Sequence, residues 1–214
     1  AIDVKQTTWT QPEIDFAVAK ILNGCNWWAT NAPSCIQLSF ALSTTLAPTS
    51  YEPINRCGPT ISSTCPVGEN QEIWISEIMD AVFPAGAGFA SYFDKVRGFA
   101  DQQRLFFDTD WAVTFFVVDD DGDPDARFLD GFFAYTYLGG PFIVMTKRND
   151  GWGFFNMDAV AAHEIGHNFY ALDEYCVANP PFSGYLNIPN GNSLTLFPGE
   201  CPTLTPWLST AGQR

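Results

Sequence analysis

The sequence is poor in positive charge. Only 10 of its 214 residues are Lys or Arg, against 24 Asp or Glu, which gives a formal net charge of −14. A polyanion of this kind repels the phosphate backbone of nucleic acids and the anionic surface of membranes. We therefore do not expect a nucleic-acid-binding protein.

Long apolar runs are also missing. The longest, near Ala112–Val118 and Pro141–Met145, fall far short of the ~18 residues that span a bilayer, so we expect no membrane insertion. Hydrophobic residues still make up 46% of the chain and charged residues only 16%, which is typical of a globular protein. The length favours a single domain.

No two cysteines are spaced C-x-x-C, which argues against a zinc ribbon or a thioredoxin-like site. The six cysteines instead form an even set, as in disulfide-bonded proteins of oxidising, extracytoplasmic compartments. Proximity along the chain favours the pairs Cys25–Cys35, Cys57–Cys65 and Cys176–Cys201, among the 15 connectivities that six thiols allow. We therefore expect a secreted protein with disulfide-stapled loops; the alternative is free thiols in a cytosolic protein.

The hydrophobic periodicity predicts a mixture of helices and strands, and therefore the α+β class. Apolar residues at helical spacing predict helices over 11–32, 69–82, 89–106 and 156–172. Alternating or continuous apolar runs predict strands over 34–46, over 111–118, and once or twice within 131–146. Pro- and Gly-rich coil is expected over 47–70 and after Asn179.

Histidine is scarce, and both histidines lie in one motif, His163-Glu164-Ile165-Gly166-His167. The motif falls in a segment that predicts a helix, where residues four apart share a face, so both imidazoles can bind one Zn²⁺ ion. Glu164 can point toward a water at the metal, accept its proton and pass it to a leaving group. The alternative is a pair of histidines that bind no metal.

A catalytic zinc site takes a third protein ligand and leaves the fourth position to water. With no histidine left, the downstream candidates are Asp173, Glu174 and Glu200. On a continuous helix Glu174 would lie ~10.5 Å beyond His167, so the helix has to break near residues 168–170 for either acidic neighbour to turn back. Glu200 lies in a Pro-Gly-Glu-Cys-Pro coil. We expect Asp173 to be the third ligand, with Glu174 as the alternative.

The run from His163 to Asp173 resembles the metzincin pattern H-E-x-x-H-x-x-G-x-x-[HD]. It is still more similar to secreted bacterial zinc peptidases related to the IgA-specific metallopeptidases. In those, H-E-[FIL]-G-H is followed by a short aromatic-containing stretch that ends in Asp-Glu-Tyr, as His163–Tyr175 does here. The match covers about residues 140–176. The sequence departs from the metzincins where Tyr170 replaces their glycine, and it has no methionine after Met157 to form a Met-turn.

This resemblance implies a zincin-like domain, with an N-terminal subdomain over about 1–168 and a short C-terminal one over about 169–214. It also implies a secreted zinc-dependent endopeptidase that acts on a protein or peptide substrate. His163, His167 and Asp173 would hold Zn²⁺, and Glu164 would be the general base and then the acid. Tyr175 is the first candidate to stabilise the oxyanion, ahead of Tyr170 and Tyr185. The strand near Gly139–Thr146 would form the sheet edge above the cleft, where substrate binds as an added strand; the alternative is an ordinary core strand.

A second group of carboxylates lies between two predicted strands. Asp119, Asp121, Asp123 and Asp125 alternate there and offer the hard oxygen ligands that Ca²⁺ prefers, although the EF-hand spacing is not met. We therefore hold calcium binding as a hypothesis, beside the alternative of a solvated acidic turn.

Two other functions fit the same motif. One is a zinc hydrolase of non-peptide amides or esters. The other is a secreted binding or assembly module that keeps a non-catalytic, structural zinc site. Glu164 discriminates the last from an enzyme, because a purely structural site needs no carboxylate beside the metal.

Overall fold

The computed structural model describes residues 9–47, 49–50, 54, 71–121, 124–128 and 130–173. The helices of this part are α1 (Gln11–Asn31), α2 (Gln71–Val82), α3 (Tyr92–Phe106) and α4 (Met157–Asn168). Its strands are β1 (Thr114–Val118), β2 (Ala134–Thr136) and β3 (Phe142–Thr146). Short 3-10 turns are η1 (Pro84–Gly88), η2 (Asp150–Trp152) and η3 (Phe154–Asn156). The expected α+β class is confirmed.

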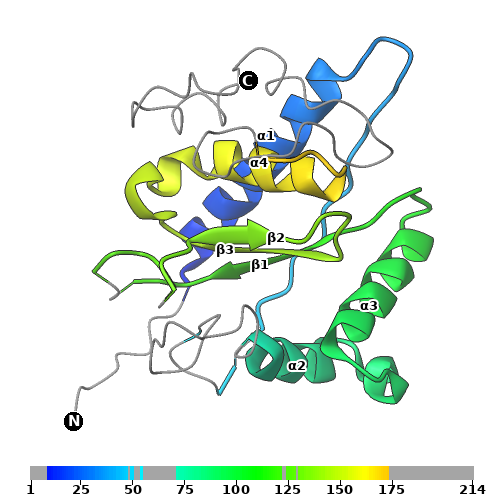
Figure 1. The fold of residues 1–214 in the computed structure, drawn as a ribbon, viewed down its shortest axis with the longest axis vertical. Coiled ribbons are helices and arrows are strands. Elements are labelled where there is room, and N and C mark those ends of the chain that lie inside the picture. The colour runs from blue at the N-terminus through cyan, green and yellow to red at the C-terminus, as the bar shows by residue number, and fades with distance from the viewer. Residues whose placement is uncertain are drawn as a thin grey trace, which may run out of the picture.

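The strands form one mixed sheet in the order β1-β3-β2. β3 pairs in parallel with β1 and antiparallel with β2, so β3 is central and all five of its residues are buried. Helices α1 and α4 cover one face of the sheet, and α2 and α3 lie on the other (Figure 1). None of the helices in the described ranges has the length and apolar character that crossing a membrane requires.

Alternate residues of β3 divide the core into two halves. Phe142 and Val144 pack with Trp74, Met79 and Val96 in the cluster under α2 and α3. Ile143 and Met145 point the other way, into the cluster formed with α1 and α4. Because successive side chains of a strand face opposite sides, one continuous apolar run serves both layers.

Helix α4 is held against the sheet by α1. The indole Nε1 of Trp28 donates a hydrogen bond to the carbonyl oxygen of Ala162, at 2.8 Å. The same ring lies on Gly166, where a Cβ would come within 3.2 Å of it. The glycine of the histidine motif therefore lets α1 approach the helix that carries both histidines, and one large aromatic side chain fixes the helix position.

Most predicted elements are confirmed, with boundaries shifted by a few residues. The helices over 11–32, 69–82 and 89–106, the strand over 111–118 and two strands within 131–146 all correspond to observed elements. The last helix ends at Asn168 and not at Leu172. This is the break near residues 168–170 that Asp173 needs in order to turn back toward the histidines. The C-terminal subdomain and the coil after Asn179 lie largely or wholly outside the described residues.

Two strand predictions are wrong. Residues 34–46 are coil, with Ile36 and Leu46 half or more exposed, because alternation favours a half-buried strand but supplies no partner for its backbone. The strand within 139–146 is not the sheet edge that the resemblance implied; it is β3, the central strand, as the alternative of an ordinary core strand predicted. A continuous apolar run is typical of a strand buried on both faces, and the shorter β2 is an edge of the described sheet.

The expected Cys25–Cys35 disulfide is not formed, and both thiols are free. Cys25 is buried in the middle of α1, in the cluster shared with α4, whereas Cys35 is exposed beyond the end of that helix. Burial raises the pKa of the Cys25 thiol to about 11. Cys25 therefore serves as a small core residue. The pairs Cys57–Cys65 and Cys176–Cys201 lie outside the described residues.

Candidate metal centre

A sharp turn follows α4 and reverses the chain. Tyr170 adopts a left-handed conformation, with φ 65°, at the position of the glycine in the metzincin pattern. Its N–H donates to the carbonyl oxygen of His167 (2.9 Å), and Ala171 N–H donates to that of Gly166 (3.0 Å). The turn that a glycine was expected to provide is thus made by a tyrosine.

The tyrosine is held in this conformation by Gly139. The Tyr170 ring lies so close to the Gly139 Cα that any side chain there would collide with it. Gly139 has a φ of 79°, and its N–H donates to the carbonyl oxygen of His167 at 3.0 Å. The loop between β2 and β3 therefore supports both the end of α4 and the turn that follows it.

This turn brings three potential metal ligands together. Nε2 of His163 and Nε2 of His167 are 3.2 Å apart, and Oδ1 of Asp173 lies 3.2 Å from the first and 3.3 Å from the second. These spacings would allow hydrogen bonds, yet the buried Oδ1 has no aligned donor among the described residues. An oxygen in that state, facing two imidazole nitrogens, indicates a place for a cation.

The triangle has the dimensions of a zinc site. A tetrahedral Zn²⁺ with ligands at ~2.0–2.1 Å has its ligand atoms ~3.3–3.4 Å apart. The three observed separations, 3.2, 3.2 and 3.3 Å, fit one face of such a tetrahedron. The His₂Asp donor set is also one that Zn²⁺ accepts, and the open fourth position is typical of catalytic sites.

The second nitrogen of His167 sets its tautomer. Nδ1 lies 2.8 Å from the carbonyl oxygen of Ala171. Because a carbonyl can only accept, Nδ1 carries a proton. In the neutral ring the free lone pair is then on Nε2, the atom that faces His163 and Asp173. A metal-ligating histidine is commonly oriented by a carbonyl in this way.

In the metal-free protein, the carboxylates beside His167 favour the protonated, positively charged form of its imidazole. Burial by itself lowers the pKa of His167, but the Asp173 carboxylate, with help from Glu164 and the Ala171 carbonyl, raises it to about 9. Burial likewise raises the pKa of Asp173, and the two imidazoles outweigh it and hold that pKa well below its usual range. A metal ion would replace this proton.

Glu164 and the three potential ligand residues line one cleft of about 260 Å³ between α4 and β2. Residues 131–136, Trp152, Ala159 and Val160 complete its walls. Glu164 is 6% exposed, so its carboxylate is shielded from bulk water but faces the cleft that holds the ligands. A larger hollow, of about 470 Å³, lies between residues 43–47 and helices α2 and α3, and its described lining has no charged or histidine side chain.

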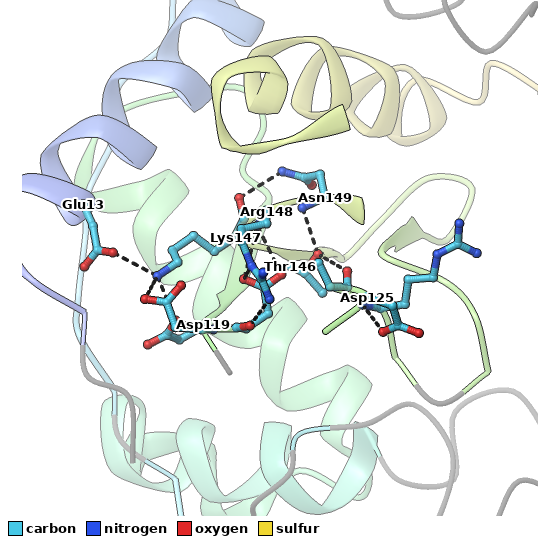
Figure 2. A network of polar contacts seen from close by, with 11 residues as sticks. Glu13, Asp119, Asp125, Thr146, Lys147, Arg148 and Asn149 are labelled. Atoms are coloured by element: carbon cyan, nitrogen blue, oxygen red, sulfur yellow. Dashed lines mark hydrogen bonds and ion pairs between the residues drawn. The ribbon is translucent and has the colours of Figure 1, made fainter. Parts of the chain in front are cut away.

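The aspartates after β1 contact a lysine. Nζ of Lys147, which is 2% exposed, lies 3.0 Å from Asp119 and 2.6 Å from Asp121, and 3.0 Å from Glu13 at the start of α1 (Figure 2). Burial lowers the pKa of Lys147, but the three carboxylates outweigh it and raise it above its usual value. Lys147 thus supplies at Asp119 and Asp121 the positive charge that was expected from Ca²⁺.

The other carboxylates of this run, Asp120 among them although it was not a predicted calcium ligand, take different roles. Asp120, between the two, accepts a hydrogen bond from Nε of Arg148 at 3.2 Å, and burial raises its pKa despite that contact. Asp125 accepts from the backbone N–H of Arg127 within its own turn, at 3.3 Å. Asp123 lies outside the described residues. The calcium hypothesis stays a prediction.

Several predicted site residues fall where the structure gives no description: Glu174, the alternative ligand, and Tyr175 and Tyr185, two oxyanion candidates. Tyr170, the remaining tyrosine, packs on Gly139. The sequence did not indicate the cleft walls at Phe132 and Phe133, whereas Trp152 was expected in the core, with a binding role as the alternative. No short motif marks them; the sole available signal was a concentration of aromatic residues on both sides of β3.

No family model, curated protein or solved structure matches the chain.

Proposed function

We propose that this protein is a secreted, zinc-dependent endopeptidase. The observation that carries the proposal is the triangle of His163, His167 and Asp173, with sides of 3.2–3.3 Å, in a cleft that also holds Glu164. A zinc ion bound there would polarise a carbonyl group and acidify a water molecule. The secreted location rests on the family resemblance of the sequence, because the two described cysteines are free thiols and do not support it.

Glu164 is the proposed proton carrier. It precedes the turn of helix that ends in His167, and it lines the cleft together with the ligands. A carboxylate in this position takes a proton from the attacking water and passes it to the departing amine. Its near-complete burial favours both steps, because a shielded carboxylate interacts more strongly with a nearby developing charge than a solvated one.

The edge strand β2 supports a peptide as substrate. β2 pairs with β3 on one side, and in the described sheet its other side has no strand beside it. Residues 134–136 line the same cleft as the ligand triangle. An extended peptide can add to such an edge through main-chain hydrogen bonds, which places its carbonyl groups along the cleft.

The two alternatives predict different behaviour. A structural zinc site commonly takes four protein ligands, whereas the group found among the described residues has three and opens to a cleft. A hydrolase of non-peptide esters or amides would use the same ligands and Glu164 but would have no need of a strand edge. The kind of substrate that the protein hydrolyses therefore distinguishes a peptidase from a hydrolase of non-peptide esters or amides.

The test combines metal content with hydrolysis. Zinc-loaded wild-type protein, Glu164→Gln and the control Glu72→Gln, an exposed glutamate on α2, are analysed for bound zinc by mass spectrometry. Each is then incubated with unfolded casein, with a peptide library and with small ester and amide substrates. We expect one zinc per chain in all three, peptide hydrolysis in wild type and Glu72→Gln, and at least a ~100-fold loss in Glu164→Gln.

Zinc binding without any hydrolysis would support the structural site, and hydrolysis of small esters or amides alone would support the non-peptide enzyme. Absence of zinc binding would overturn all three readings. Equal peptide hydrolysis by wild type and Glu164→Gln would remove Glu164 from the mechanism.

A further inference from the structure

The cleft has an apolar half beside the metal ligands. Phe132 and Phe133 contribute from the loop before β2, Trp152 from η2, and Ala159 and Val160 from the first turns of α4. Phe132 is one of the residues that line the cleft, and 49% of its surface is exposed. Apolar surface left open next to polar ligand groups is a common feature of binding sites, because a ligand can bury it.

Polar contacts tie together the two loops that form this half. The guanidinium of Arg127 lies 2.6 Å from the carboxylate of Asp150, which begins η2, and 3.5 Å from the carbonyl oxygen of Gly131. The Thr146 N–H also donates to the Phe133 carbonyl oxygen, at 2.8 Å. The loop of Phe132 and the turn of Trp152 are thus fixed relative to one another before any ligand binds.

A chain of hydrogen bonds continues from β3 into η2. The Asn149 N–H donates to Oγ1 of Thr146 (3.1 Å), and the Trp152 N–H donates to the carbonyl oxygen of Asn149 (3.1 Å). Figure 2 shows Thr146 and Asn149 facing one another at the end of β3. Preformed walls of this kind reduce the ordering that a bound side chain would otherwise impose.

Size and charge indicate what the apolar half accepts. The cleft volume, about 260 Å³, is below the ~300–1,000 Å³ of clefts that enclose a whole small molecule. It therefore suits one or two side chains of a ligand whose remainder lies outside. Beyond the ligands and Glu164, the described walls carry no charged side chain. A charged group would lose its hydration there without gaining a partner.

We propose that this apolar half selects substrates with a large apolar side chain, aromatic or leucine-like, next to the cleaved peptide bond. The inference rests on the proposed endopeptidase function and names its substrate class. Phe132, Trp152 and Ala159 determine the choice: the two aromatic residues by contact with the side chain, and the alanine by leaving room for it. Arg127 contacts both loops, through Asp150 and the carbonyl oxygen of Gly131.

The experiment is a cleavage-site profile. Wild type and variants are incubated with a library of natural peptides, the new termini are sequenced by mass spectrometry, and kcat/KM is measured for matched peptides that differ only in Phe, Leu, Ala or Lys beside the cleaved bond. We expect wild type to prefer Phe or Leu over Ala by ~10- to 200-fold, the range that apolar pockets reach. Lys should be cleaved no better than Ala.

The variants test each wall. Trp152→Ala and Phe132→Ala should reduce the preference for Phe over Ala by ~10-fold. The whole change should come from a lower kcat/KM for the Phe peptide, with kcat/KM for the Ala peptide unchanged. Ala159→Phe should fill the pocket and invert the preference toward Ala, an effect that loss of folding cannot mimic. Phe106→Ala, which removes a 78% exposed ring from α3, is the matched control and should leave the profile unchanged. A flat wild-type profile, or a profile unchanged in all three wall variants, would overturn the inference.

A second measurement distinguishes failure of the apolar-pocket inference from failure of the endopeptidase proposal. If zinc-loaded wild type cleaves no peptide, the endopeptidase proposal fails, and binding of fluorescein-labelled Phe and Ala peptides to the same protein is then measured by fluorescence polarisation. At least ~10-fold tighter binding of the Phe peptide, lost in Ala159→Phe, would keep the apolar pocket as a binding site. Equal affinity for the two peptides would overturn it.

Discussion

Nδ1 of His167 lies 2.8 Å from the carbonyl oxygen of Ala171, four residues further along the chain. The turn at Tyr170 that makes this contact is also the turn that brings Asp173 to the two imidazoles. One local structure therefore sets the tautomer of His167 and the position of Asp173. The geometry of the proposed ligand group depends on that turn as much as on the helix.

Removal of the Asp173 carboxylate should weaken zinc binding far more than removal of its neighbour. Loss of a residue that merely orients a ligand costs ~10- to 100-fold in affinity, so Asp173→Asn should cost at least ~100-fold. Glu174→Gln, one residue away with the same change in charge, should cost less than ~3-fold. Zinc dissociation constants from competition with a chromophoric chelator test this, and a larger effect in Glu174→Gln would make Glu174 the ligand.

Gly139→Ala should destabilise the protein and the metal site together. Its φ of 79° disfavours a side chain, and the new methyl group would collide with the Tyr170 ring. We expect a loss of ~2–4 kcal/mol in the free energy of unfolding, from strain and overpacking combined. Gly151→Ala, where the new methyl would meet no atom within 4 Å, should stay within ~0.5 kcal/mol of wild type.

Urea unfolding of the zinc-free proteins measures these losses, and zinc titration of the folded variants follows. If Gly139→Ala were destabilised but bound zinc with wild-type affinity, the turn would support the fold without orienting the ligands.

The helices and the grouping of His163, His167 and Asp173 were predictable because they depend on local spacing. The i,i+4 relation of His163 and His167 is fixed once a helix forms, and the need for a third ligand led to Asp173 and to a break near residues 168–170. The means of that break was not predictable. Tyr170 can take a left-handed conformation because Gly139, 31 residues earlier, leaves space for its ring.

The errors share a long-range cause. Residues 34–46 alternate like a strand, but hydrogen-bond partners come from elsewhere in the chain and leave no mark in the segment itself. Cys25 and Cys35 are near in sequence, yet the α1–α4 interface buries the first. Nothing in the run of aspartates after β1 predicts Lys147 as their partner, because the two segments meet only through the parallel pairing of β1 with β3.

The zinc-free protein should lose stability as the pH rises through about 9. The pKa of His167 is raised from 6.5 to about 9 in the fold, so its charged form stabilises the fold fully below ~6.5, and that contribution disappears as the pH rises through 9. The pKa of Asp173 is lowered, so its contribution is present above ~4 and lost in acid. The pair therefore stabilises the metal-free fold most between pH ~4 and ~6.5.

We expect this loss to amount to roughly 2–3 kcal/mol between pH 6.5 and 9.5, at about 1.4 kcal/mol per pKa unit. Urea unfolding of zinc-free wild type and Asp173→Asn at both pH values isolates it, since the asparagine variant lacks the carboxylate that raises the His167 pKa. Parallel pH dependences in the two proteins would show that this pair contributes nothing.

Lys147→Met should be among the most destabilising substitutions of a charged residue in the described chain. The ammonium group is 2% exposed and contacts Glu13, Asp119 and Asp121, so its removal leaves carboxylates packed together without a counter-charge. Loss of one partner of a buried ion pair costs ~3–5 kcal/mol, and we expect about 3 because Asp121 is 44% exposed. Lys95→Met is the control: it breaks a single pair with Asp80, which is 61% exposed, and should cost at most ~1 kcal/mol.

The same two variants decide the calcium hypothesis, because Lys147 occupies the position where Ca²⁺ would bind Asp119 and Asp121. If the lysine is the sole cation there, millimolar Ca²⁺ should leave the Tm of wild type and Lys95→Met unchanged. It should raise the Tm of Lys147→Met, since carboxylates without a counter-charge attract a hard cation. A rise of equal size in all three proteins would instead mean that Ca²⁺ binds beside the lysine, through carboxylates that Lys147 does not contact, such as Asp125. In that case Asp125→Asn, which removes the negative charge and keeps the size of the side chain, should abolish the rise in Tm. The lysine and the calcium ion would then stabilise the same loop independently.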